Sequence, residues 1–405
     1  MGDDCFDSRQ KHGMEYRETE VVDAVSKTKL VYVLPTYDAD SQEHMFHIYG
    51  FLEALAEHLE VLLIIERARG YPRFRNLRVY QRHLHVPILR ALEVLAVMLW
   101  ARLHGYKRFY SHYSISAAVL SALVTRILGA VSYYWSCVHT LDFVPRHIRT
   151  LADLKLKLRN QYLLGLALRL VHHLVTGTPT MARYYSDGYH LPLSSVRVMP
   201  NWVDLERFKG LPEKAALRTQ LGWPVDRKVV LFLHRVVERK GAHFIVPIAR
   251  EVLARYPGDA RDPLFVIAGS GPYEDKLKRE VQEAGLESVR LVGGVPNREA
   301  IRYFAAADVY MVPSLEEGFP RTLLEAMAAG CPFTTTDVGG VQDILTPEQA
   351  QFMAAVGDVQ GMAASIICLL TDQALRESLI RAGYQNVLNY TQDKVVQVLV
   401  AMVCE

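Results

Sequence analysis

Short apolar runs alternate along the chain with longer stretches in which apolar residues recur every three to four positions. The runs have the length of buried strands, and the stretches have the period of helices that pack on one face. In the first half, the pattern predicts strands at 30–34, 61–65, 108–112, 131–138 and 174–176, and helices at 44–58, 117–128 and 154–172. Strands separated by helices form a parallel, doubly wound sheet, which binds ligands beyond the carboxyl ends of its strands.

The same alternation starts again after a strand predicted at 196–200. Further strands are predicted at 229–233, 264–268, 289–292, 309–312 and 333–336, and a final helix at 393–403. At 405 residues the chain is too long for one ordinary domain, so we expect two α/β domains. We place a loose tail at 1–28, the first domain at 29–199, the second at 200–390 and a last helical segment at 391–405.

Composition narrows the class of protein. Half of the residues are hydrophobic, and the five cysteines are scattered without the paired spacing of a zinc site. Unpaired cysteines favour a reducing compartment, so we expect a cytoplasmic protein. Residues 1–28 are too polar for a signal peptide. The apolar runs near 86–101 and 113–138 contain charged residues, which argues against membrane-spanning segments.

Charge is distributed unevenly, although the net charge is only +2. Residues 67–108 contain ten Lys/Arg and one acid, Glu93, while residues 146–183 contain seven Lys/Arg and one acid, Asp153. Such a basic surface binds either nucleic acid or an anionic membrane, and the interleaved Leu, Val and Trp residues favour the membrane. The helix predicted at 154–173 repeats this combination, which fits an ordinary solvated face or a helix at a membrane interface.

The stretch from 308 to 343 holds the densest group of candidate functional residues. A predicted strand leads through a turn at Gly318 into a helix predicted at 321–329. The start of a helix directs free backbone N–H groups at an anion, so this turn is a candidate phosphate site. Glu317 precedes the turn. Glu325 lies one turn inside the helix, where a carboxylate can accept hydrogen bonds from vicinal hydroxyls such as those of ribose.

Two further loops carry candidate groups for the same ligand. Arg235 and Lys240 follow the strand at 229–233 and stand five positions apart before a helix, so both can converge on one diphosphate. We expect both in an open cleft. Gly269 and Gly271 follow the next strand and would let a nucleotide approach the backbone, although a third glycine of a dinucleotide fingerprint is missing.

Together these motifs resemble the EGFG…E signature and its partner loops in the large retaining GT-B glycosyltransferase family, the group 1 or family 4 type. The resemblance covers roughly 29–390 and is most specific in the second half. There NWVDLERF, HRVVERKG, GSGP and EEGFPRTLLE stand in the family's order. The resemblance implies two Rossmann-like domains that face each other across a cleft, with the final helix returning to the first domain.

The resemblance also implies roles for individual residues. Arg235 and Lys240 would neutralise the departing diphosphate, and Glu325 would hold the ribose. Glu317 and His139 would orient the donor sugar. The residues expected to bind the donor nucleotide are Gly269, Gly271, Val295, Gly318, Phe319, Arg321, Thr322, Leu323 and Glu325.

The chain departs from the family pattern at several positions. Pro320 stands where a glycine is common and supplies no N–H, so a phosphate would rely on the three residues that follow it. Trp202 and His234 also replace glycines of the family.

Two aspartates and two histidines in the first half are ambiguous. Asp38 and Asp40 spell the DxD of metal-dependent glycosyltransferases with the other common fold. Aspartates in a loop are usually turn residues, so we predict no metal site. His112 and His139 both end predicted strands, where a histidine is often structural. The resemblance points to His139, and the choice between the two stays open.

The sequence therefore predicts a retaining, metal-independent glycosyltransferase that uses a nucleotide-diphosphate sugar and no other cofactor. The expected acceptor is a saccharide or a lipid-linked saccharide. The expected location is the cytoplasmic face of a membrane, bound peripherally to its anionic surface, with no nucleic-acid partner. A sugar-nucleotide epimerase of the same fold and a non-catalytic binding scaffold are the alternatives.

Overall fold

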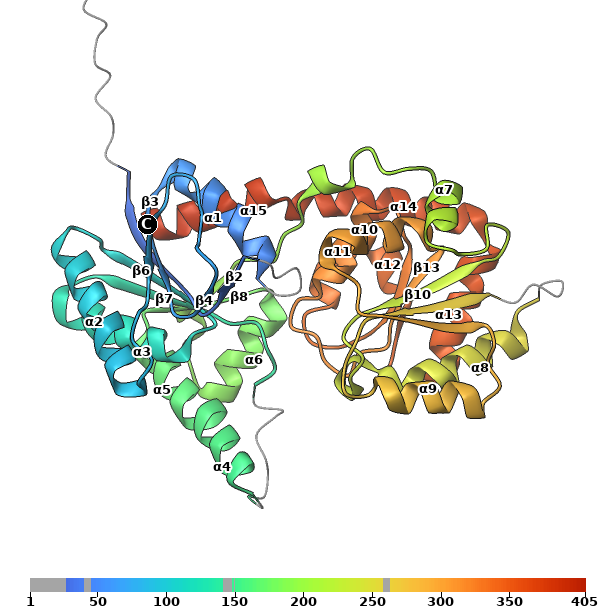
Figure 1. Cartoon of the computed structure of the whole chain (residues 1–405), viewed down its shortest axis with the longest axis horizontal. Helices are drawn as coiled ribbons and strands as arrows, with labels where there is room; N and C mark the ends of the chain where they lie inside the picture. The colour runs from blue at the N-terminus through green and yellow to red at the C-terminus, as the bar shows by residue number, and fades with distance from the viewer. Residues whose placement is uncertain (1–26, 40–44, 141–147, 149, 258–262) are drawn as a thin grey trace, which may run out of the picture.

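The computed structural model describes residues 27–39, 45–140, 148, 150–257 and 263–405. The chain forms two lobes, each built around a parallel sheet with helices packed against it (Figure 1). The predicted pair of doubly wound α/β domains is thereby confirmed.

The first lobe contains a seven-stranded sheet with the order β5-β3-β1-β6-β7-β8-β9. Its strands are β1 (Lys29–Leu34), β3 (Glu60–Ile65), β5 (Arg78–Gln81), β6 (Arg108–His112), β7 (Val131–Trp135), β8 (His173–Thr176) and β9 (Val196–Val198). Its helices are α1 (Phe46–His58), α2 (Pro87–Leu103), α3 (Ile115–Leu128), α4 (Leu151–Lys157), α5 (Leu164–Leu170) and α6 (Pro179–Tyr189). A separate parallel pair is formed by β2 (Tyr37–Asp38) and β4 (Ala68–Arg69).

Successive residues of β1 face two different cores. Val31 and Val33 belong to a core shared with α2 and α3, whereas Tyr32 and Leu34 belong to the core that includes α1. A strand that is buried on both faces needs apolar residues at every position. This burial explains why the strands are recognisable in the sequence as continuous apolar runs.

The second lobe contains a six-stranded sheet with the order β12-β11-β10-β13-β14-β15. Its strands are β10 (Val229–Leu233), β11 (Leu264–Ala268), β12 (Val289–Gly293), β13 (Val309–Val312), β14 (Phe333–Thr336) and β15 (Met353–Ala354). Its helices are α7 (Lys214–Gln220), α8 (Ile245–Arg255), α9 (Glu274–Glu283), α10 (Asn297–Ala306), α11 (Arg321–Ala328), α12 (Pro347–Ala350), α13 (Val359–Thr371) and α14 (Gln373–Val387).

Several regions of the first lobe differ from the predicted elements: β5 and α6 are not predicted, and β7 is shorter than the strand predicted at 131–138. The single helix predicted at 154–172 is interrupted by a π-helical segment, Leu158–Leu163, which joins α4 to α5. The apolar run near 86–101 forms α2, a helix that the pattern does not predict. Across the residues that the structure describes, no helix is both long and apolar enough to cross a membrane.

The last helix, α15 (Gln392–Cys404), leaves the second lobe and lies beside α1 in the first (Figure 1). Val403 accepts a hydrogen bond from Arg108 Nε at 2.7 Å, and Met402 accepts one from Tyr133 Oη at 3.0 Å. The two connections between the lobes run side by side, because the N–H of Val203 donates to the carbonyl of Tyr390 at 2.9 Å. The lobes are thus joined by a double crossing.

Candidate active site

The carboxyl ends of the two sheets meet at the turn between β13 and α11. A Cβ at Gly318 would lie 2.0 Å from the carbonyl oxygen of Cys137 in the first lobe. A Cβ at Gly177 would lie 2.8 Å from Cys137 Sγ and 3.0 Å from Phe319 Cβ. Only glycine at 177 and 318 lets the lobes approach this closely. The predicted turn at Gly318 therefore lies at the boundary between the lobes.

Glu317 is buried beside this boundary and held by three neighbours. Its Oε1 lies 2.7 Å from Lys240 Nζ, accepts a hydrogen bond from Ser314 Oγ at 2.8 Å and lies 3.7 Å from His234 Nε2. Burial raises the pKa of Glu317, but the charge of Lys240 and these contacts outweigh burial, so the pKa is lower than usual. The site thus contains a fixed carboxylate anion.

Lys240 is not in an open cleft, and the expectation from the sequence is wrong for this residue. Its side chain is drawn into the loop, because Nζ donates to the carbonyl of Glu316 at 3.1 Å and pairs with Glu317. Only 8% of the residue is exposed. Arg235 is exposed, as an open cleft requires. The two cations therefore play different parts: one is embedded and the other is free to meet a ligand.

A cavity of about 390 Å³ opens at the carboxyl ends of β10 and β11. Its volume lies in the range of sites for small molecules. Its lining includes five of the residues predicted from the sequence, Arg235, Gly269, Gly271, Val295 and Thr322, together with His234, Ser270, Gly294 and Asn297. The structure thus brings four separate segments to one cavity: the loops after β10, β11 and β12, and the start of α11.

Gly269 and Gly271, after β11, are needed for a packing reason that the sequence does not reveal. Gly269 has a φ of +138°, and a Cβ there would lie 1.9 Å from the carbonyl oxygen of His234. A Cβ at Gly271 would lie 2.3 Å from the carbonyl oxygen of Val236. Both glycines are required so that the loop after β11 can pack on the loop after β10, and this packing shapes the cavity that they line.

Glu325 lies one turn inside α11 and is only 4% exposed. Arg321 Nη2 stands 3.5 Å from Glu325 Oε1. Burial raises the pKa of Glu325 above its usual value, and the positive charge of Arg321 offsets this effect only in part. The guanidinium of Arg321 also lies 5.6 Å from the ring centre of Phe46 on α1, and that of Arg207 lies 5.3 Å from the same ring. This pair therefore links the predicted ribose carboxylate to the first lobe.

The start of α11 offers mainly backbone groups to an anion. The side chains of Phe319 and Leu323 are buried, 7% and 0% exposed, so these residues can contribute only through the main chain. The N–H of Leu323 already donates to the carbonyl of Pro320 at 3.1 Å. The N–H groups of Arg321 and Thr322 precede the first helical hydrogen bonds and stand at the positive end of the helix dipole.

His139 reaches the second lobe beside Glu317. A Cβ at Gly339 would lie 2.5 Å from His139 Nε2 and 1.9 Å from the carbonyl oxygen of Glu317. The ring of His139 packs against Tyr184 of α6 at 4.6 Å. Tyr185 Oη fixes the adjoining backbone, since it donates to the carbonyl of Val138 at 2.8 Å. The structure therefore places His139 at the boundary of the lobes.

The other end of the His139 loop is tied to the π-helical segment Leu158–Leu163. Asn160, which is 3% exposed, donates from Nδ2 to the carbonyl of Thr140 at 3.3 Å. Tyr189 Oη lies 3.0 Å from Thr140 Oγ1 and donates to the carbonyl of Asn160 at 2.7 Å. The π-turn thus directs a buried amide at the residue that follows His139.

His112, the other candidate histidine, is part of the core of the first lobe. It is 2% exposed, its Nδ1 lies 2.8 Å from Tyr32 Oη, and its ring stacks on Trp135 at 4.7 Å. Burial lowers the pKa of His112 to about 3, so the ring is neutral. Of the two histidines, only His139 lies against the second lobe.

The aspartates do not assemble a metal site in the part of the chain that the structure describes. Asp38 lies in β2, 4.0 Å from Arg69, and Asp40 falls outside the described residues. Among the described residues, no group of three His, Cys, Asp or Glu could hold a metal ion.

Two parts of the site were missed by sequence reasoning. His234 Nδ1 accepts a hydrogen bond from the N–H of Arg235 at 2.8 Å, so its Nε2 carries the proton that faces Glu317. Tyr113, at the end of β6, has a left-handed backbone with a φ of 55° and packs edge-on against Trp135. Such a conformation is strained for a tyrosine. Nothing in the local sequence signals either arrangement.

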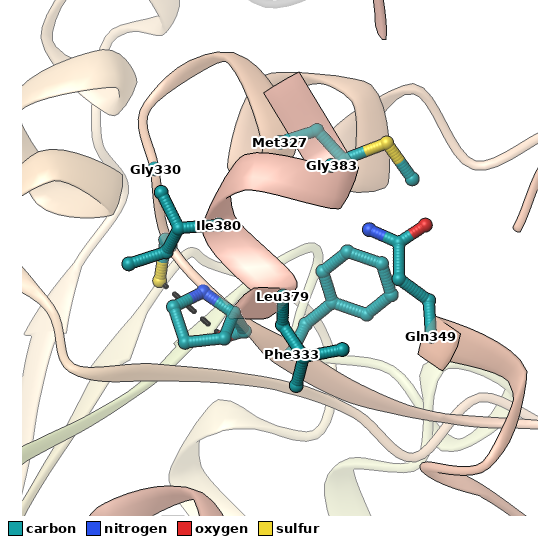
Figure 2. Close-up of a pocket in the computed structure, with 9 residues that line it drawn as sticks. Met327, Gly330, Phe333, Gln349, Leu379, Ile380 and Gly383 are labelled. Atoms are coloured by element: carbon teal, nitrogen blue, oxygen red, sulfur yellow. Dashed lines mark hydrogen bonds between the residues drawn. The ribbon is translucent and has the colours of Figure 1, made fainter. Parts of the chain in front are cut away.

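A second, smaller cavity lies behind α11, away from these residues. Figure 2 shows its lining, which includes Met327, Phe333, Gln349 and Leu379. Its volume of about 10 Å³ is that of a packing defect large enough for one water molecule at most. The cavity does not compete with the larger one as a ligand site.

Residues 213–386, which contain Arg235, Lys240, Glu317 and Glu325, match the family model described as glycosyl transferases group 1. These residues form a group 1 glycosyltransferase domain, and the chain as a whole has the GT-B fold. Over 76% of its length, this glycosyltransferase is 26% identical to D-inositol 3-phosphate glycosyltransferase of Corynebacterium urealyticum, of which it covers 74%. It is 32% identical to 2-deoxystreptamine N-acetyl-D-glucosaminyltransferase of Niallia circulans, over 42% of each chain.

Solved structures share the fold of this glycosyltransferase over nearly its whole length. HepE of Anabaena, in complex with UDP and glucose, matches with a TM-score of 0.69 and 18% identity over 93% of this chain and 99% of HepE. Sucrose-phosphate synthase from Thermosynechococcus elongatus matches with a TM-score of 0.71 and 18% identity over 93% and 98% of the two chains. At such identities the likeness concerns the fold alone, and it confirms the predicted GT-B architecture.

Proposed function

We propose that this protein transfers a sugar, with retention of its anomeric configuration, from a nucleotide-diphosphate sugar to a hydroxyl of a saccharide acceptor. The ionised Glu317–Lys240 pair, placed between the lobes and beside a cavity of suitable volume, carries the proposal. The related fold of HepE, solved with UDP and glucose, supports a nucleotide sugar as donor. Retention rests on the resemblance of the motifs.

The diphosphate of the donor would lie between Arg235 and the start of α11. There the Arg235 guanidinium and the N–H groups of Arg321 and Thr322 supply positive charge where the departing diphosphate gains negative charge. These groups are already in place, so they need little reorganisation during the reaction. Lys240 would act indirectly, through the Glu317 carboxylate with which it pairs.

The sugar and the ribose would be read by two different carboxylates. The backbone of Glu317 and the ring of His139 both lie against Gly339, so a sugar bound beside them would contact both domains. Glu325 would accept hydrogen bonds from the ribose hydroxyls, and this task requires its ionised form. Arg321 opposes the rise in the pKa of Glu325 that burial causes, and so favours that form.

A thermal-shift panel of UDP-, GDP- and ADP-sugars tests the donor site. We expect the sugar nucleotides of one base to stabilise the protein. Glu325→Gln should weaken the binding of the free nucleotide and of the sugar nucleotide equally. A loss of affinity confined to the sugar nucleotide would mean that Glu325 touches the sugar.

Product analysis tests the reaction itself. Incubation of the protein with donor alone should yield no epimer. Transfer should survive EDTA, whereas rescue of a chelated enzyme by Mg²⁺ or Mn²⁺ would revive Asp38 and Asp40 as a metal site.

The proposal for the acceptor and the location is argued from the first lobe. We propose that the exposed face of α4, the π-helical segment and α5 binds the cytoplasmic surface of an anionic membrane, where the acceptor is a lipid-linked saccharide. Lys155 and Arg159 line this face together with Leu158, Tyr162, Leu163 and Leu166. Apolar side chains between basic ones suit a bilayer interface. Charge reversal at Lys155, Lys157 and Arg159 should reduce co-sedimentation with anionic vesicles and leave nucleotide affinity unchanged.

A further inference from the structure

The segment from Arg82 to Arg90, here called the Arg82–Arg90 loop, is an exposed apolar loop together with the first turn of α2, and it has an arginine at each end. It leaves β5 at the carboxyl edge of the first sheet and enters α2 at Pro87. Its exposed apolar side chains are Leu84 (42%), Val86 (55%), Ile88 (74%) and Leu89 (43%). Four large apolar side chains within six residues are costly to leave in water, so this loop is expected to have a partner.

The loop is held in one shape by Glu93 of α2. The Glu93 carboxylate accepts hydrogen bonds from the N–H groups of His83 at 2.7 Å and Leu84 at 2.8 Å, and from Tyr80 Oη at 2.8 Å. Burial raises the pKa of Glu93, but these hydrogen bonds outweigh burial and lower it. Glu93 is the one acid between residues 67 and 108. Its carboxylate therefore fixes the backbone of the loop, and its charge partly offsets the positive charge around Arg82.

Positive charge gathers at the base of the loop. The N–H of Arg82 donates to the carbonyl of Ile65 at 3.0 Å, so Arg82 and Arg67 leave neighbouring strands at the same edge of the sheet. Arg82 Nε is buried and has no hydrogen-bond partner within the described residues. Burial and the nearby charge of Arg90 lower the pKa of Arg82, although Glu66 opposes them. An anion between the guanidinium groups would relieve this repulsion.

We propose that the Arg82–Arg90 loop is a clamp for the phosphate of the lipid-linked acceptor. The apolar tip would enter the acyl region of the bilayer, and Arg82 and Arg90 would hold the phosphate at its surface. The loop belongs to the same helical layer as the membrane face proposed above, because α2 packs on α3 and α3 packs on α5. The inference rests on the proposed function for the identity of the acceptor.

The sheet sets the distance between this clamp and the site of transfer. In the order β5-β3-β1-β6-β7, four strand spacings separate the loop after β5 from the His139 loop after β7. At about 4.8 Å per spacing, the two loops are about 19 Å apart. The acceptor would therefore carry several sugar units between its lipid phosphate and the hydroxyl that receives the new sugar. A phospholipid glycosylated directly on its headgroup would be too short.

Binding to vesicles tests the clamp. The probes are phosphatidylcholine vesicles with and without phosphatidylglycerol. We expect Arg82→Gln/Arg90→Gln to weaken binding to the anionic vesicles about 30-fold, since each arginine contributes about 1 kcal/mol at such a surface. The matched control, Arg250→Gln/Arg279→Gln, removes two exposed arginines from α8 and α9 of the other lobe and should change little. Equal losses in both variants would overturn the clamp.

Glu93→Gln separates a shaped clamp from diffuse attraction. This change makes the protein more basic, so diffuse electrostatics predicts tighter binding to anionic vesicles. The clamp predicts weaker binding, because the carboxylate that holds His83 and Leu84 is lost. Tighter binding by a variant with an unchanged melting temperature would refute the proposal.

A separate variant, with its own control, tests the apolar tip formed by Leu84 and Ile88. Leu84→Ser/Ile88→Ser should weaken binding to both vesicle types, whereas Val225→Ser, at a residue 51% exposed in the second lobe, should not. Nucleotide affinity should stay unchanged in every variant of the loop, because the donor cavity belongs to the second lobe. If nucleotide binding is absent from the unaltered protein, the proposed function fails. If only the vesicle results fail, the clamp fails.

Discussion

At the scale of single residues, Lys240 and Glu317 are two buried charges that depend on each other. Removal of one partner leaves the other buried without compensation, which typically costs about 3–5 kcal/mol. We therefore expect Lys240→Ala to lower both the melting temperature and the rate of transfer. The rate should fall about 100-fold or more, as when one charge-stabilising group is deleted from an active site.

A double variant separates these two effects. Lys240→Ala/Glu317→Gln removes both charges, so it should recover most of the melting temperature that Lys240→Ala loses. Transfer should stay low, because neither group is available to the donor. Recovery of activity along with stability would show that the pair is only structural. The measurements are thermal unfolding and initial rates of transfer.

His112 should make stability depend on pH. In the unfolded chain a histidine takes up a proton near pH 6.5, whereas burial lowers the pKa of His112 to about 3 in the folded protein. The unfolded state therefore binds more protons between these two values. Stability is complete above pH 6.5 and declines as the pH falls towards 3, by up to about 1.4 kcal/mol per unit.

Urea unfolding of His112→Gln at pH 7, 6 and 5 measures this contribution. The variant should lose stability more gently than the original protein as the pH falls. The exposed His85 offers a control, since His85→Gln should keep the original slope. Identical slopes in all three proteins would mean that His112 is protonated in the folded state.

Residues of the second lobe could be predicted because they follow consecutive strands in a familiar order. The choice between His112 and His139 could not, since both end a predicted strand. The difference is tertiary: one ring is enclosed by Tyr32 and Trp135, and the other passes the sheet edge to reach the opposite lobe. The burial of Lys240 was missed for the same reason, because Glu316 and Glu317 come from a distant loop.

At the scale of elements, the π-helical segment Leu158–Leu163 connects the proposed membrane face to the His139 loop. Asn160 is the connecting side chain, through its hydrogen bond to Thr140. We expect Asn160→Ala to lower kcat about 5-fold, which is the effect of one lost hydrogen bond of about 1 kcal/mol. Nucleotide affinity should be unchanged, since the donor cavity lies in the other lobe.

Leu158→Ala is the matched control for Asn160→Ala. Leu158 lies in the same segment but is 49% exposed, so its loss should not disturb the His139 loop. Rates measured in detergent, without a membrane, keep the two roles of the segment apart. A normal kcat for Asn160→Ala would exclude Asn160 as a positioning residue.

The elements themselves were predictable in unequal degree. Strands such as β10 and β11 match their predicted bounds, because burial on both faces leaves only apolar residues. The helix α2 escaped notice for a physical reason. Its outward face carries Ile88, Leu92 and Trp100, which are 74%, 54% and 44% exposed, so the usual polar stripe of a surface helix is absent. The π-turn within 154–172 leaves no trace in a helical pattern.

At the scale of the whole molecule, the order of the motifs was enough to predict the fold. The close approach of the lobes, in contrast, is visible only in the three-dimensional structure. Glycines at 177, 318 and 339 let backbone from one lobe meet the other within van der Waals distance. A glycine in a sequence shows that a side chain is absent. It does not show which distant segment fills the space.

The return of α15 to the first lobe has a consequence for how the chain folds as it is made. His58 and Gln397, 339 residues apart, lie 3.2 Å from each other, and Val395, Leu399 and Val403 are buried. The surface of α1 that α15 covers stays bare while the ribosome synthesises the entire second lobe. The first lobe is therefore synthesised first but completed last. Until α15 is made, the uncovered apolar surface of α1 is available to a chaperone.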